Sequence, residues 1–157
     1  MEALFLSYFD ELLGPSTFQV FPLGDDPAVT GFSSRIRRKV GKLAAIQGEE
    51  GFFIRDFDTF TTANYRFSVR SEWTHSARQF LNLTIATDSY PAEVFRGVLE
   101  KGTAHLQKIT NVASAFYVKS RPGDESVQQA SVSLKEFVVQ LGNDICDLIG
   151  QAGAFQI

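Results

Sequence analysis

Residues 3–9 read Ala-Leu-Phe-Leu-Ser-Tyr-Phe, and residues 80–86 read Phe-Leu-Asn-Leu-Thr-Ile-Ala. Each stretch is a short, nearly continuous apolar run, which is typical of a β-strand buried on both faces. Two such strands are expected to be neighbours at the centre of one sheet. Helices must then cover both faces of that sheet. These two stretches therefore predict a layered α/β fold.

Three further strands are expected around this pair. The Gly14-Pro15 turn joins the first strand to residues 17–21, which alternate and are mostly β-branched or aromatic, so the two form a hairpin. Residues 52–57 form another aromatic-rich strand. Residues 64–72 alternate, with aromatic or apolar side chains at 65, 67 and 69 and polar ones between them. One face of this strand is therefore expected to be wet or paired.

Helical patterns fill the rest of the chain. The first helix is expected to start near residues 24–27, to bury Phe32, Ile36, Val40 and Leu43, and to end before Gly48. A second helix is expected from a cap at Asp88 or Ser89 to Ile109, with residues 113–118 as an extension. The last helix carries an apolar stripe over 134–149 and is expected to stop at Gly150 and Gly153.

The element order is therefore two strands, a helix, three strands and two helices. We predict a single domain over residues 1–157, an α/β/α sandwich around a five-stranded mixed or antiparallel sheet. One helix covers one face and the helix pair covers the other. The length of 157 residues agrees with one domain that supports its own core.

This order of elements resembles the longin (profilin-like) fold. Residues 4–15, which end in Leu13-Gly14-Pro15, are similar to the first hairpin of longin domains in nitrogen permease regulator-like proteins and folliculin. The related roadblock domain usually begins with a helix, whereas a strand is expected here from Ala3. The resemblance implies a module for small GTPase regulation or vesicle trafficking rather than an enzyme.

Composition excludes several function classes. The net charge of −3 argues against a nucleic-acid binder held by phosphate contacts. One Cys and two His leave no disulfide framework and too few ligands for most metal sites, so neither metal nor cofactor is expected. No Gly-x-Ser-x-Gly elbow is present, and Gly41-Lys42 lacks the upstream glycine of a phosphate-binding loop. Cys146 is expected to be an inert thiol beside the last apolar stripe.

Location is also an expectation from the sequence. Glu2 stands where a signal peptide would carry a positive charge, and no apolar run is long enough to span a bilayer. A cytoplasmic protein is therefore expected, with peripheral contact to membranes as an additional possibility.

The strongest charge asymmetry lies in the first helix. Five of the 15 basic residues fall within eight positions, which leaves the rest of the chain at −8. Four of them flank one side of the apolar stripe: Arg35, Arg38, Lys39 and Lys42. This patch is either a solvated helix face or a surface for an acidic partner or an anionic membrane, where each charge contributes about 1 kcal/mol.

Arg78 is the sharper candidate, at the end of a polar loop over residues 73–78. The stretch 76–83 looks like the segment that supplies an arginine finger to a Rag-type GTPase in nitrogen permease regulator-like longin domains, although two spacings differ by one residue. A guanidinium on such a loop can neutralise charge on a transferring phosphoryl group. The alternative is an exposed arginine at a strand entry. Trp73 is either a contact residue beside it or part of the core.

Two functional hypotheses remain. The first is an interaction module that binds a small GTPase, another longin or roadblock domain, or a second copy as a homodimer through an exposed edge strand. The second is a small-ligand sensor of the profilin or PAS type, with a cavity lined by some of the 15 phenylalanines.

Overall fold

The computed structural model describes residues 2–23, 34–45 and 48–154. Within these ranges the chain forms five strands: β1 (Glu2–Asp10), β2 (Gly14–Pro22), β3 (Gly51–Asp56), β4 (Thr61–Arg70) and β5 (Arg78–Thr87). The helices are α2 (Ser34–Lys42), α3 (Arg96–Leu106) and α4 (Glu125–Ala154), with the 3₁₀ helices η1 (Leu43–Ala45), η2 (Ala92–Phe95) and η3 (Val112–Ser120). The expected order of strands and helices is confirmed.

The five strands form one antiparallel sheet in the order β2-β1-β5-β4-β3. β5 is the central strand and β1 lies beside it, so the two apolar runs are neighbours as expected. The physical reason is burial, because residues 3–6 of β1 are all 0% exposed. β2 and β3 are the two edges of the sheet.

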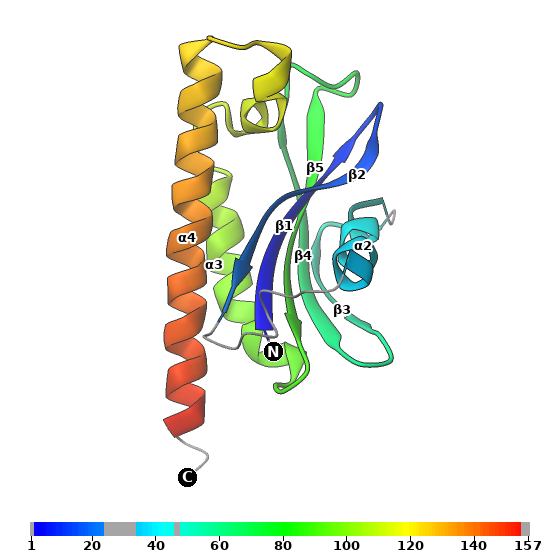
Figure 1. The fold of residues 1–157 in the computed structure, drawn as a ribbon, viewed down its shortest axis with the longest axis vertical. Coiled ribbons are helices and arrows are strands. Elements are labelled where there is room, and N and C mark those ends of the chain that lie inside the picture. The colour runs from blue at the N-terminus through cyan, green and yellow to red at the C-terminus, as the bar shows by residue number, and fades with distance from the viewer. Residues whose placement is uncertain (1, 24–33, 46–47, 155–157) are drawn as a thin grey trace.

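Helices cover both faces of the sheet (Figure 1). α3 and α4 lie along one face, and the main core between them and the sheet contains Leu4, Leu83, Leu134 and Ile145. α2 lies on the opposite face, where a smaller core gathers Phe5, Val40 and Phe60. Alternation along the strands explains the division, because successive side chains point to opposite faces.

α2 is described from Ser34, and the expected helix start at residues 24–27 lies outside the described residues, as does Phe32. Ile36 and Val40 point toward the small core as expected. The helix ends at Lys42 and is followed by η1, so it stops before Gly48 as predicted.

The region after β5 differs from the expected long helix. No side chain caps η2; instead the Thr87 hydroxyl accepts hydrogen bonds from the backbone N–H groups of Ser89 and Tyr90, each at 3.1 Å. The extension over residues 113–118 is also wrong. α3 ends at Leu106, short of the expected end at Ile109, and residues 112–120 form the separate helix η3, which begins after Asn111 in a left-handed conformation with φ 54°. Asparagine adopts a positive φ more readily than most residues, and the spacing of apolar residues does not show where this happens.

α4 is longer than expected at both ends. It begins after Asp124, whose Oδ1 accepts hydrogen bonds from the N–H groups of Ser126 at 3.0 Å and Val127 at 3.4 Å. The Ser126 hydroxyl also donates to Oδ1, at 2.7 Å, and this bond, followed by the backbone bonds, lowers the pKa of Asp124, as expected for an N-cap carboxylate. The helix also continues through Gly150, so the expected stop there is wrong. A glycine within a helix lowers the stability of the helix but does not prevent it from continuing.

Candidate functional site

Three segments meet at the upper end of the molecule in Figure 1: the β1–β2 hairpin, the loop between β4 and β5, and η3. Printed contacts connect them. The backbone N–H of His75 donates to the Glu11 carboxylate, with N···O distances of 3.1 and 3.2 Å. Tyr8 of β1 stacks on Phe116 of η3 with ring centroids 4.3 Å apart. This end therefore gathers loops from distant parts of the chain, which is where binding residues commonly lie.

The tip of the β1–β2 hairpin exposes two leucines. Asp10 Oδ1 accepts hydrogen bonds from the N–H groups of Leu12 at 2.8 Å and Leu13 at 2.9 Å, and Gly14 supplies the positive φ that the turn requires. With its backbone held in this way, the tip leaves Leu12 94% exposed and Leu13 80% exposed. Large apolar side chains in this setting suit contact with another macromolecule.

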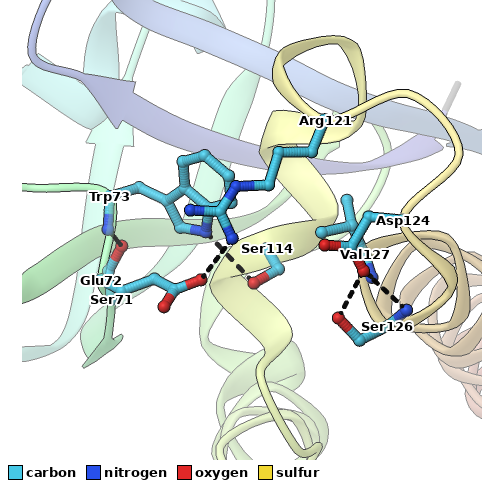
Figure 2. A network of polar contacts seen from close by, with 8 residues as sticks. All are labelled: Ser71, Glu72, Trp73, Ser114, Arg121, Asp124, Ser126 and Val127. Carbon is cyan, nitrogen blue, oxygen red and sulfur yellow. Dashed lines mark hydrogen bonds and ion pairs between the residues drawn. The ribbon is translucent and has the colours of Figure 1, made fainter.

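Trp73 connects the β4–β5 loop to η3, as Figure 2 shows. Its Nε1–H donates to Ser114 Oγ at 3.1 Å, and the Arg121 guanidinium lies 4.6 Å from the ring centroid. Its ring also stacks on Tyr117, with centroids 4.9 Å apart and planes 10° apart. Trp73 is half-buried, so its ring faces are engaged within the chain rather than open to a partner.

Arg78 is not in the loop where the sequence placed it, because it is the first residue of β5. The hydroxyls of Thr74 and Ser76 donate to its carbonyl oxygen, at 2.8 and 3.1 Å, and fix its backbone. The residue is exposed, and its guanidinium donates to Ser68 Oγ from Nε, at 2.8 Å, and from Nη2. Ser68 in turn donates to Glu50 Oε1 at 2.6 Å. Ser68 therefore orients the Arg78 side chain, and the residue is still exposed to solvent.

A hollow of about 550 Å³ opens beside Arg78. Arg70 and Ser71 line it at the end of β4, and Asn111 and Ser114 line it at the start of η3. The volume lies within the ~300–1,000 Å³ typical of small-molecule sites. A second hollow of about 490 Å³ lies between Arg78, the exposed ring of Phe80, and Ala44 and Gly48, which follow α2.

The basic residues of α2 are mostly solvated. Arg37, Arg38 and Lys42 are exposed, while Lys39 Nζ lies 5.6 Å from the centroid of the Phe57 ring. Arg35 belongs to α2, but its side chain lies outside the described residues. The structure thus places Arg38 and Lys42 one turn apart on the surface.

His105 and Cys146 are not part of this group of loops. His105 of α3 lies 6.5 Å from the Phe137 ring, and Cys146 is half-buried on α4 against the main core. Among the described residues, no group of three or more His, Cys, Asp or Glu side chains could hold a metal ion.

Sequence reasoning missed Ser68 and Glu50, which hold Arg78, and did not single out Arg70. The alternation over residues 64–72 did place 66, 68 and 70 on one face, and the structure shows that Arg66 and Ser68 are buried and hydrogen-bonded there. Their partners depend on strand register, which the pattern does not specify.

Comparison of the sequence with known protein families and with curated proteins finds no match. Within residues 2–23, 34–45 and 48–154, no helix combines the length and apolar character needed to cross a membrane.

Proposed function

We propose that the chain is a non-catalytic interaction module that binds a small GTPase, in regulation or in membrane traffic. One observation carries the proposal: Arg78 is exposed at one end of the molecule while Ser68 holds its guanidinium in a defined orientation. An arginine held in this way loses little conformational entropy when it contacts a partner. The exposed leucines of the β1–β2 hairpin belong to the same end and add apolar contact area.

The proposal includes a longin-type identity for the fold. It is supported by the sheet order, in which β1 and β5 are neighbours, and by one helix on one face and two on the other. The proposal also includes three further contacts. The β2 or β3 edge would pair with a longin or roadblock partner, or with a second copy of the chain in a homodimer. Arg38 and Lys42 of α2 would contact an anionic membrane.

The chemistry proposed for Arg78 is that of an arginine finger supplied in trans. In the complex, the guanidinium would enter the nucleotide site of the GTPase and neutralise negative charge that develops as the bond to the γ-phosphoryl group breaks. Such a group contributes about 10³–10⁵ in kcat. The chain itself performs no hydrolysis; it completes the active site of its partner.

The test is single-turnover GTP hydrolysis by a panel of small GTPases, with and without the full chain. We expect stimulation of at least one GTPase by wild-type protein and loss of that stimulation with Arg78→Ala. Arg55→Ala is the matched control, because Arg55 is an exposed arginine on edge strand β3. Equal stimulation by the Arg78→Ala variant would contradict the arginine-finger role. Absence of binding to every GTPase in either nucleotide state would overturn the wider proposal.

Small-ligand sensing is a second candidate, favoured by two buried polar side chains. Ser7 and Asn82 face each other in the β1–β5 register, both are 0% exposed, and neither side chain has a hydrogen-bond partner among the described residues. If they serve only the fold, Asn82→Leu should raise the melting temperature, because an unsatisfied buried amide is removed. If they bind a ligand, compounds that raise the melting temperature of the wild type should not stabilise this variant.

A further inference from the structure

Two arginines lie directly opposite each other at the end of the sheet. Arg70 is the last residue of β4, Arg78 is the first of β5, and the antiparallel register pairs them. Both residues are exposed. Like charges at directly opposed positions are unfavourable, so this arrangement carries an electrostatic cost that a bound anion would remove.

No carboxylate in the described part of the chain forms an ion pair with either arginine. The acid in the lining of the 550 Å³ hollow is Glu72, which instead pairs with Arg121 at 3.6 Å. Glu11, which lines the 490 Å³ hollow together with Arg78, accepts the backbone N–H of His75. Glu50 contacts Arg78 only through the Ser68 hydroxyl. No carboxylate of the described residues therefore forms a direct ion pair that compensates either guanidinium, in a protein whose net charge is −3.

Neutral and cationic donors surround the pair. A third hollow, of about 460 Å³, shares Arg70, Arg78 and Asn111 with the 550 Å³ hollow and adds Lys108 from the segment after α3. Ser114 also lines the 550 Å³ hollow, and its Oγ accepts the Trp73 N–H, which leaves its own hydroxyl proton to donate. The 550 and 460 Å³ hollows thus share both arginines, and further hydrogen-bond donors are among the residues that line them.

We propose that Arg70 and Arg78 form a binding site for a phosphoryl group with a charge near −2, such as a phosphate monoester or a diphosphate. Two guanidinium groups match two negative charges. Arg70 offers a planar pair of N–H donors to phosphate oxygens, and Arg78, whose Nε and Nη2 donate to Ser68, offers its remaining N–H groups. A monocarboxylate leaves one arginine uncompensated. This inference goes beyond the proposed GTPase contact, because it concerns an anion that the isolated chain binds by itself.

The test is calorimetric titration of the full chain with pyrophosphate and with inorganic phosphate at low ionic strength. We expect saturable binding that weakens as salt is added. Arg70→Gln and Arg78→Gln should each weaken it by roughly tenfold or more, as expected for loss of a charge-assisted hydrogen bond. Arg70→Lys should restore part of the affinity, and Arg55→Gln should bind like wild type. Equal affinity in wild type and Arg70→Gln, with both proteins folded, would overturn the site.

The same proteins distinguish the source of the phosphoryl group. If the group belongs to the nucleotide of a GTPase, pyrophosphate should inhibit stimulated hydrolysis by occupying the arginines. If it belongs to a free phosphorylated molecule, binding persists without any effect on a GTPase. Binding that depends on Arg70, with no stimulation of any GTPase, would remove only the proposed function. Stimulation that depends on Arg78, with no pyrophosphate binding, would remove only this inference.

Discussion

Three side chains on the polar face of β4 differ in burial and in hydrogen bonding because their neighbours differ. Arg66 is 6% exposed; its Nη2 donates to the Leu43 carbonyl at 3.2 Å, and burial lowers its pKa. Ser68 is buried and bridges Arg78 to Glu50. Arg70 is exposed opposite Arg78. The same alternation therefore yields a structural arginine, a positioning serine and a candidate ligand-binding arginine.

Tyr117 provides a pH-dependent prediction at this scale. Its hydroxyl donates to Gln79 Oε1 at 2.7 Å, and burial, with smaller effects from the Asp10, Tyr8 and Glu11 charges, raises its pKa to about 12. An unfolded tyrosine ionises near 10. The folded state therefore keeps this proton while the unfolded state loses it. The stabilisation is fully present below pH 10 and is lost as the pH rises through about 12.

Ultraviolet titration of phenolate absorbance tests this prediction, with circular dichroism of the same samples as the check on folding. Subtracting the titration curve of Tyr117→Phe from that of wild type should leave the ionisation of one tyrosine with a midpoint near pH 12. A difference curve centred near pH 10 in folded protein would show that Tyr117 is not shielded.

At the scale of elements, α4 shows how close packing depends on one small residue. A Cβ atom added to Gly142 would overlap the Phe21 ring of β2, whereas a Cβ atom on Gly150 meets nothing within 4 Å. Both glycines lie in the same helix. The contact at Gly142 therefore seats α4 against the β2 edge of the sheet.

The two glycines form a matched pair of substitutions. Gly142→Ala should destabilise the protein by about 1–3 kcal/mol, because Phe21 or the helix must move. Gly150→Ala should stabilise it by up to ~1 kcal/mol, because alanine is the better helix former. Urea unfolding measures both. Equal effects of the two substitutions would mean that α4 does not pack on Phe21 as described.

For the whole molecule, stability should depend mainly on the centre of the sheet. Leu83 of β5 is 0% exposed within the main core, whereas Ile54 of edge strand β3 is 38% exposed. Leu83→Ala should cost about 2–5 kcal/mol, since it removes buried atoms and leaves a cavity. Ile54→Ala should cost less than ~1 kcal/mol, because it removes a side chain already in partial contact with water.

Chemical unfolding of both variants, followed by fluorescence of Trp73, gives the comparison. Trp73 is the one tryptophan of the chain and contacts η3, so it reports on the junction of loop and sheet. Equal losses of stability for Ile54→Ala and Leu83→Ala would contradict the prediction that stability depends mainly on the centre of the sheet.

Local pattern was sufficient for the strands, the apolar faces of the helices and the neighbouring positions of β1 and β5. Burial on both faces demands a continuous apolar run, and such a run is visible in the sequence. The break between α3 and η3 and the continuation of α4 through Gly150 were not predictable in the same way. They depend on a backbone conformation and a packing environment that apolar spacing does not encode.

The candidate site was only partly visible beforehand. The sequence by itself determined that an arginine lies close to the start of the central strand, that residues 66, 68 and 70 share a face, and that the chain carries few histidine and cysteine residues to bind a metal. Only the tertiary structure decided that Arg78 belongs to β5, that Arg70 lies opposite it and that Ser68 holds it. The reason is that cross-strand neighbours are set by register, and register results from the packing of the whole sheet rather than from any one segment.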